Sequence, residues 1–297
     1  MAIINSIVMG KARGSIGNAT LAIVGGDTVA RQKISKGTGG GVVRSYAQMR
    51  RRVTWANIVN LWQAFGGNDR PSFQNRGNRV SDFNRFIQSN LGGRPVYLTK
   101  EEARQGGCVA ADYQVSEGEL ASREIVAGGT NGEIHTDISL GSLAISESTT
   151  IGQFSRAIIG ANPEFLNGDQ ITVFVAQQTV NSVTNVPYVN MTSAKIVLNS
   201  SDDETLLSEI DPGGLFFAKT AGTDKLGMSQ AINGAVVYIH SRREQGVVKV
   251  STQAFVATNT LLNSYITDAK EVAAIQSYGG KLTGYYLDPN VAAIQTV

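Results

Sequence analysis

The chain contains few of the residues that build covalently cross-linked or metal-held folds. Among its 297 residues there are one cysteine, two histidines and six prolines. A single cysteine excludes an internal disulfide, and one cysteine with two histidines is too few for a Cys/His zinc site. So little proline also excludes a proline-rich linker. Disulfide-stapled secreted domains, zinc modules and thiol redox pairs are therefore excluded.

Long apolar runs are missing as well. One of the longest, residues 235–239, has five apolar residues, whereas a membrane-spanning helix needs about 18 or more. The first ten residues have no basic segment ahead of their apolar residues, as a secretory signal would have. We therefore expect a soluble protein that is made inside the cell and has no membrane partner.

The two parts of the chain, by contrast, carry large net charges of opposite sign. Residues 1–106 contain 16 Lys and Arg against 5 Asp and Glu, whereas residues 107–297 contain 10 against 19, so the net charges are +11 and −9. Three interpretations remain open. The basic part binds nucleic acid, or it docks on the acidic part of another copy to give head-to-tail rings or filaments, or the two parts neutralise one another within one subunit.

Residue patterns change at the same boundary. Before it, Gly-Gly-Asp at 25–27 between two β-branched runs indicates a hairpin. Apolar spacing of three and four residues over 44–65 predicts a helix, and a second helix follows at 81–91. The glycine-rich residues 36–41 between hairpin and helix form a predicted loop, which lacks the G-K-[ST] ending of a phosphate-binding loop.

Beyond the boundary, β-branched residues alternate and are interrupted by Gly, Asn and Asp, which predicts several strands. Two helices are expected among them, near 150–160 and 259–275. The predicted fold class is therefore α+β, with two domains. A basic strand-hairpin and helical region (1–106) is followed by an acidic, β-rich body (107–297) that resembles a sandwich or barrel.

The first predicted helix carries the candidate contact residues. Its apolar stripe includes two tryptophans, and three arginines precede the stripe. Arg51 falls on the same face as both tryptophans, where it would stack on Trp55 or join its two neighbours in a basic patch. The simpler alternative is a core helix whose arginines are solvated or paired. The predicted partner-contact residues are Arg50, Arg51 and Arg52, with Trp55 and Trp62 as apolar anchors.

No motif in the chain indicates catalysis. The run E-I-H-T-D places Glu133, His135 and Asp137 on one side of a strand, which suits acid–base chemistry but is also ordinary for a half-exposed strand. Cys108 has no histidine near it in sequence, and the acidic run 200–204 lacks the spacing of a calcium loop. The G-x-S-x-G and H-E-x-x-H motifs are absent. We therefore expect no enzyme activity, no cofactor and no metal.

Three segments near the start have a distinctive layout: a glycine-rich start with G-x-x-G-N (GKARGSIGNAT, 10–20), a basic strand (TVARQK, 28–33) and a Gln/Arg-rich helix (AQMRRRVTWANIVNLWQAF, 47–65). This layout resembles an uncharacterised protein family of Bacteroidota and their phages, and residues 168–175 and 237–243 lie where that family has strands. The glycine-rich residues 36–41 depart from it, because family members usually have a proline-bearing stretch there.

The resemblance implies a non-enzymatic structural virion protein of a tailed (crAss-like) bacteriophage, such as a ring, connector or head-accessory component. Such a protein is made in the host cytoplasm and resides in the virion. Its expected partners are further copies of itself and other virion proteins, with packaged DNA as a further candidate. The alternative function is nucleic-acid binding through the same arginine cluster.

Overall fold

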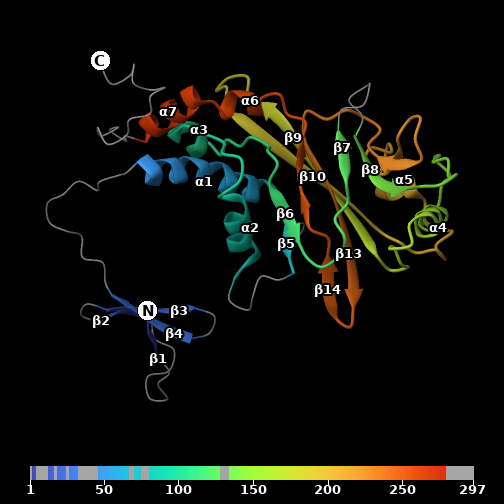
Figure 1. Cartoon of the computed structure of the whole chain (residues 1–297), viewed down its shortest axis with the longest axis horizontal. Coiled ribbons are helices and arrows are strands. Elements are labelled where there is room, and N and C mark those ends of the chain that lie inside the picture. Colours follow the sequence, from blue (N-terminus) through green and yellow to red (C-terminus); the bar gives the residue numbers. More distant parts are fainter. Residues whose placement is uncertain are drawn as a thin grey trace. The chain divides into compact units, whose positions relative to one another are not determined.

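The computed structural model divides the chain by its internal contacts into two compact units (Figure 1). The first comprises Met1–Arg44 with Arg76–Ser81, and the second comprises Ser45–Asn75 with Asp82–Val297. We call the described strands of the first unit the N-terminal sheet and the second unit the body. The structure describes residues 2–4, 13–16, 19–24, 27–32, 46–66, 70–74, 80–127 and 134–278.

The N-terminal sheet is antiparallel and has four strands in the order β1-β4-β3-β2. Val24 lies opposite Asp27 in the register, which confirms the hairpin predicted at 25–27. The predicted loop 36–41 lies outside the described residues. The strands are β1 (Ala2–Ile4), β2 (Gly14–Ile16), β3 (Ala19–Val24) and β4 (Asp27–Gln32).

A central antiparallel sheet forms the middle of the body. Its two long inner strands, β9 (Gln170–Val180) and β13 (Gly234–Glu244), pair directly. Because side chains alternate along a strand, Phe174 and Val237 enter one hydrophobic core and Val173 and Tyr238 enter another. Strands covered on both faces need continuous apolar runs. The outer strands are β10 (Pro187–Val197), β14 (Val247–Val250) and β16 (Val256–Ala257).

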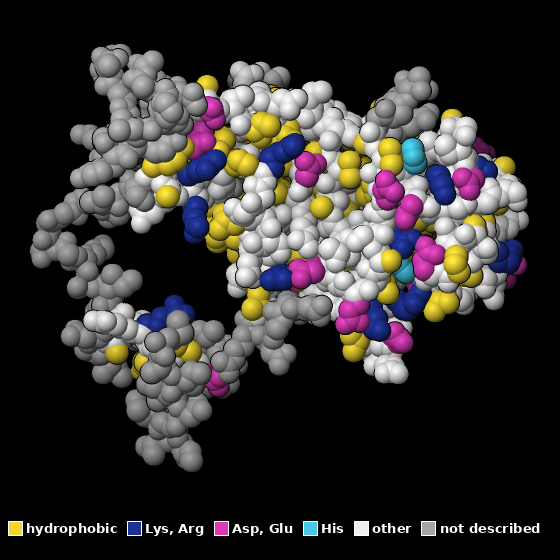
Figure 2. Space-filling model, in the orientation of Figure 1, with side chains coloured by type: hydrophobic (Ala, Val, Ile, Leu, Met, Phe, Trp, Pro, Cys, Tyr) yellow, Lys and Arg dark blue, Asp and Glu magenta, His cyan; other side chains and the backbone are white. Residues whose placement is uncertain are grey.

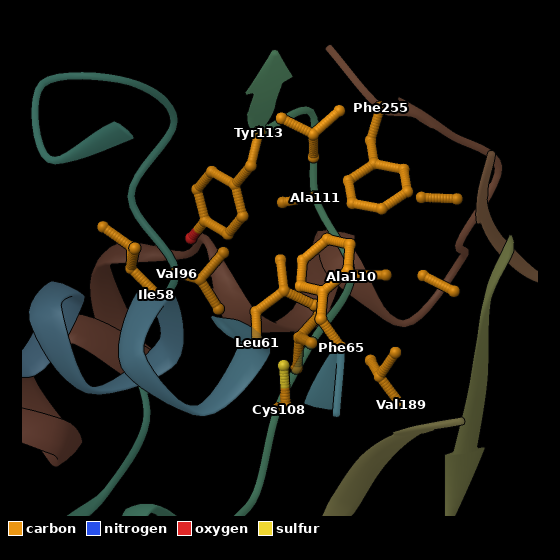
Figure 3. Close-up of a cluster of buried hydrophobic side chains, with 14 of the residues drawn as sticks. Ile58, Leu61, Phe65, Val96, Cys108, Ala110, Ala111, Tyr113, Val189 and Phe255 are labelled. Carbon is orange, nitrogen blue, oxygen red and sulfur yellow. The ribbon is translucent and has the colours of Figure 1, made fainter. Parts of the chain in front are cut away.

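Helices cover the first face of the central sheet. Phe65, at the end of α1 (Tyr46–Ala64), lies 5.3 Å from Phe174 and 6.0 Å from Phe255 between ring centroids. The helix α2 (Asp82–Asn90) contributes Phe86 to the same cluster. An extended segment, residues 107–113, carries Cys108, Ala110 and Ala111 into this core beside the α1 side chains (Figure 3). The strand that follows this segment begins at residue 114.

A second antiparallel sheet and α4 (Ile151–Ala161) cover the other face. Thr150 starts α4 with a capping box, because its side chain accepts from the Gln153 amide and the Gln153 side chain accepts from the Thr150 amide. This confirms the helix predicted near 150–160. The second sheet, in the order β11-β12-β8-β7, comprises β7 (Ile125–Ala127), β8 (Ile134–Ser139), β11 (Ala218–Lys219) and β12 (Lys225–Gly227).

The last described helices return to α1. A third cluster packs the start of α1 against α7 (Asp268–Ser277), and Tyr46 and Tyr278 lie against the same cluster. The single helix predicted at 259–275 is divided into two helices. Thr267 is the N-cap of the second one, α7, and its side chain accepts a hydrogen bond from the Lys270 amide. The remaining elements are α3 (Lys100–Arg104), α5 (Leu207–Ile210), α6 (Leu262–Tyr265), β5 (Ser72–Phe73), β6 (Gln114–Glu117) and β15 (Gln253–Ala254).

These elements confirm an α+β fold with a β-rich body. Its described strands form antiparallel sheets and one small mixed sheet, in which β5 pairs with β6 in parallel, and none of these sheets closes into a barrel. The helices α1, α2 and α3 pack within the body, so the change of charge at 106/107 falls inside one packed unit. The boundary in net charge at 106/107 therefore does not coincide with the boundary between the two compact units.

Candidate interaction surface

The helix α1 has one buried face and one exposed face, and its sequence contains neither Asp nor Glu. Its 19 residues span about 28 Å at 1.5 Å per residue. The buried face includes Met49, Val53, Asn57, Ile58 and Leu61. Because α1 has no carboxylates of its own, the charge on its exposed face comes from arginine alone.

Asn57 fixes the orientation of this helix. Its Nδ2 donates to the Val109 carbonyl at 2.9 Å, and its Oδ1 accepts from the Val109 amide at 2.8 Å. The same Nδ2 also lies 3.0 Å from the Tyr113 hydroxyl. The side-chain amide thus satisfies both backbone groups of a buried residue that has no strand partner. With Asn57 held inward, the opposite face of α1 must point outward.

Arg51, Arg52 and Trp55 lie on this outer face, which we call the basic–aromatic face. Both arginines are exposed, and neither guanidinium forms an ion pair or hydrogen bond with a described residue. Trp55 follows Arg51 by one helical turn and is 44% exposed. Arg51 does not stack on Trp55 in the described structure. Arg70 instead lies over the ring of Trp62, with its Cζ 5.8 Å from the ring centroid.

Arg50 has a different environment, although it adjoins Arg51 in sequence. Its Nε lies 3.2 Å from Glu271 Oε1, and its Nη2 donates to the Tyr97 hydroxyl at 3.1 Å. The Tyr46 hydroxyl also donates to the Glu271 carboxylate. Arg50 therefore joins α1 to α7, and its charge is neutralised within the body.

Trp62 packs inward rather than outward. Its ring centroid lies 5.6 Å from that of Phe83 and 5.4 Å from that of Phe86, both on α2. Of the five predicted contact residues, the structure thus brings three together on an exposed face and uses Arg50 and Trp62 in internal contacts. That these residues contact a partner stays a prediction.

The two tryptophans should respond differently to truncation. We expect Trp62→Ala to lower the free energy of unfolding by about 2–3 kcal/mol, because it removes a ring packed between two phenylalanines. Trp55→Ala should change it by less than about 1 kcal/mol, because nearly half of this residue is already exposed to solvent. Urea unfolding of both variants measures the difference. Equal losses would contradict the assignment of the two rings to core and surface.

Most other charges in the body are paired. The pairs Arg50–Glu271, Arg85–Glu117 and Arg94–Asp112 join the basic part of the sequence to the acidic part. On the face of the body that Figure 2 shows, basic and acidic side chains accordingly lie next to one another at several places. Part of the charge division is thus neutralised within one chain. The body's described cationic side chains that form no hydrogen bond or ion pair with a described residue are Arg51, Arg52, Arg70, Lys100, Arg104 and Arg243.

Sequence reasoning missed a buried cluster around Asp169. The Arg242 guanidinium contacts both Asp169 oxygens at 2.7 Å, and His240 Nε2 lies 2.8 Å from Oδ2. Burial would raise the pKa of Asp169, but hydrogen bonds from Arg242 and His240 outweigh it and lower the pKa to about 2. His240 is 3% exposed and lies against Phe165. The cluster joins β13 to the turn before β9 and offers no access to a substrate.

The remaining candidates for chemistry are dispersed. Cys108 is buried, and burial raises the pKa of its thiol, which opposes thiolate formation. His135 and Asp137 lie on β8, and Glu133 lies outside the described residues. Within the described ranges, no three His, Cys, Asp or Glu side chains are grouped as a metal site would require. No described helix has both the length and the apolar character to cross a bilayer.

The exposed face of α1 is thus the surface that the residues themselves single out. Its arginines were identified from the sequence, whereas the exposure of Trp55 and the internal pairing of Arg50 required the structure. No family model, curated protein or solved structure matches this chain.

Proposed function

We propose that the chain is a structural virion subunit, a ring, connector or head-accessory component, which self-associates through the basic–aromatic face of α1. One observation carries the assembly role. Arg51 and Arg52 have no carboxylate partner in the described structure and adjoin an exposed Trp55, whereas many of the body's other cations are paired. Arginine and tryptophan are enriched at the centres of protein interfaces. The virion role rests on the family likeness of residues 10–65.

The arginines and the tryptophan have complementary tasks in such an interface. Unpaired guanidinium groups steer and orient a partner that carries carboxylates, and a bidentate pair fixes its position. Trp55 supplies apolar area that leaves water on contact. Because α1 is held inward by Asn57 and Arg50, this face is presented by a fixed element, so little ordering accompanies association.

Charge reversal tests the proposal. Wild-type protein is expected to form a discrete large oligomer in mass photometry, whereas Arg51→Glu with Arg52→Glu should shift it towards monomer. The residual association should depend less on salt, because the screened attraction has been removed. Arg243→Glu compared with Arg51→Glu is the matched control, since Arg243 is also exposed and unpaired among described residues. Unchanged assembly of the double variant would remove α1 from the proposal.

Nucleic-acid binding is the second candidate, and the lack of carboxylates on α1 favours it. Arginines would contact phosphates, and Trp55 would stack on an unpaired base. This function requires an affinity for DNA that falls steeply between about 50 and 200 mM salt. Fluorescence anisotropy with labelled duplex and single-stranded DNA measures it. Absent or salt-independent binding rejects this candidate.

A further inference from the structure

We propose that the partner of the basic–aromatic face is an acidic corner on a second copy of this chain, so that copies associate head to tail. This inference rests on the proposed self-association and names the surface that α1 meets. The acidic corner comprises residues 146–156 and 199–210. It contains five carboxylates and one arginine: Glu147, Asp202, Asp203, Glu204, Glu209 and Arg156.

Backbone hydrogen bonds bring the two segments of the acidic corner together. The Gly152 amide donates to the Asp202 carbonyl at 2.6 Å, and the Leu207 amide donates to the Thr149 carbonyl at 2.9 Å. Gly152 has no room for a side chain, because a Cβ there would lie 2.5 Å from Asp203 Oδ1. The corner is therefore a packed surface of fixed shape.

The charges of this corner are mostly unneutralised. Arg156 pairs with Asp203 at 2.7 Å. The other four carboxylates form no ion pair with a described residue, and three of them, Glu147, Glu204 and Glu209, are exposed. Among the described residues, the body thus has arginines without an ion-pair partner on α1 and carboxylates without one beside α4 and α5.

Apolar side chains accompany the charges here as they do on α1. Leu166 is 50% exposed and Val197 is 51% exposed. The turn after Leu166 is bonded to the corner, because the Ser200 amide donates to Asn167 Oδ1 at 2.8 Å. Each proposed surface therefore combines exposed apolar area with charges of one sign that no described residue pairs, so Trp55 would meet apolar side chains across the contact.

The positions of the two surfaces determine the kind of assembly. The helix α1 lies at one end of the body, whereas α4 and α5 lie at the other (Figure 1). A two-fold dimer could use both surfaces only if they lay on one side of the body, where an antiparallel partner would meet both at once. Complementary ends instead give a heterologous contact, and such contacts repeat until they close into a ring or extend as a row.

Charge swapping between the two surfaces tests this pairing. Glu204→Lys with Glu209→Lys should weaken self-association at least about tenfold, as should Arg51→Glu with Arg52→Glu. All four changes in one chain should restore association to within about threefold of wild type, because the signs are exchanged. Mixing the two double variants should also restore assembly, since each supplies the face that the other lacks. Sedimentation velocity at several protein concentrations measures all four cases.

The outcomes separate this inference from the proposed function. If reversal on α1 weakens assembly but reversal at the acidic corner does not, α1 binds elsewhere, so the inference fails and the function stands. If neither reversal matters, or wild type stays monomeric throughout, both fail. The pairing is also overturned if both double variants lose self-association and the chain with all four changes does not recover it. Glu124→Lys, another exposed acidic position, is the control for Glu209→Lys, and circular dichroism verifies folding.

Discussion

Asp169→Ala is expected to lower the free energy of unfolding of the body by about 3–5 kcal/mol, the largest loss that we expect from a single substitution. The wild-type carboxylate accepts from Arg242, His240 and the Leu166 amide, and Asp169 is 1% exposed. Its removal leaves a buried imidazole and a largely buried guanidinium without their acceptor. Urea unfolding, followed by tryptophan fluorescence and circular dichroism, measures the loss.

A matched surface pair provides the control. Asp203 and Arg156 approach to 2.7 Å, the same separation as in the Asp169–Arg242 pair, but both side chains are well exposed. Asp203→Ala should therefore have a much smaller effect, because solvent replaces the lost contact. Similar losses in the two variants would show that burial does not set the importance of Asp169.

The same cluster predicts a dependence on pH. The folded-state pKa of Asp169, about 2, lies below its ordinary value of 3.8. Stabilisation by its ionised form is therefore present above about pH 4 and is lost as pH falls towards 2. Its size is on the order of 2 kcal/mol. The difference in stability between wild type and Asp169→Asn should narrow over this range, and a constant difference would contradict the cause given for the lowered pKa.

Asn57→Asp should produce the second-largest loss, about 3–4 kcal/mol at neutral pH. The asparagine donates to the Val109 carbonyl and the Tyr113 hydroxyl, and aspartate cannot donate when ionised. It would also place a negative charge in a site that is 0% exposed. Asn57→Leu, which removes the polar pairing without adding charge, should cost about 2–3 kcal/mol by leaving both backbone groups of Val109 unpaired.

Thermal and urea unfolding of these variants test the pairing. Asn190→Asp is the control, because Asn190 lies exposed on β10 and its replacement should leave stability nearly unchanged. An unchanged free energy of unfolding in Asn57→Leu would contradict the prediction, because the extended segment 107–113 would then keep its position without the side-chain amide. Near-UV circular dichroism adds an independent readout, because Tyr113 contacts Asn57 directly.

Local signals account for the elements that sequence predicted correctly. The turn between β3 and β4 and the start of α4 at Thr150 both depend on residues within a few positions of one another. Such groups can form their hydrogen bonds independently of the rest of the fold. These local elements can therefore be predicted from the sequence alone.

Distant partners account for what the sequence did not reveal. Asn57 pairs with a residue 52 positions away, and Asp169 with one 71 positions away. Nothing local marks either residue as buried. The apolar spacing grouped Trp55 and Trp62 in one stripe, whereas Trp55 is exposed and Trp62 packs against α2. Apolar spacing alone therefore does not separate the exposed tryptophan from the packed one.

The contact between α1 and α7 has a consequence for how the chain folds during synthesis. Tyr46 and Glu271 are separated by 225 positions, so α1 leaves the ribosome long before α7 exists. At about 5–20 residues per second, the delay is on the order of 10–45 s. Closing so long a loop carries a large entropic cost. The packing of α1 is therefore completed by α7, and the α1 side chains that pack against α7 stay uncovered while the intervening strands are made.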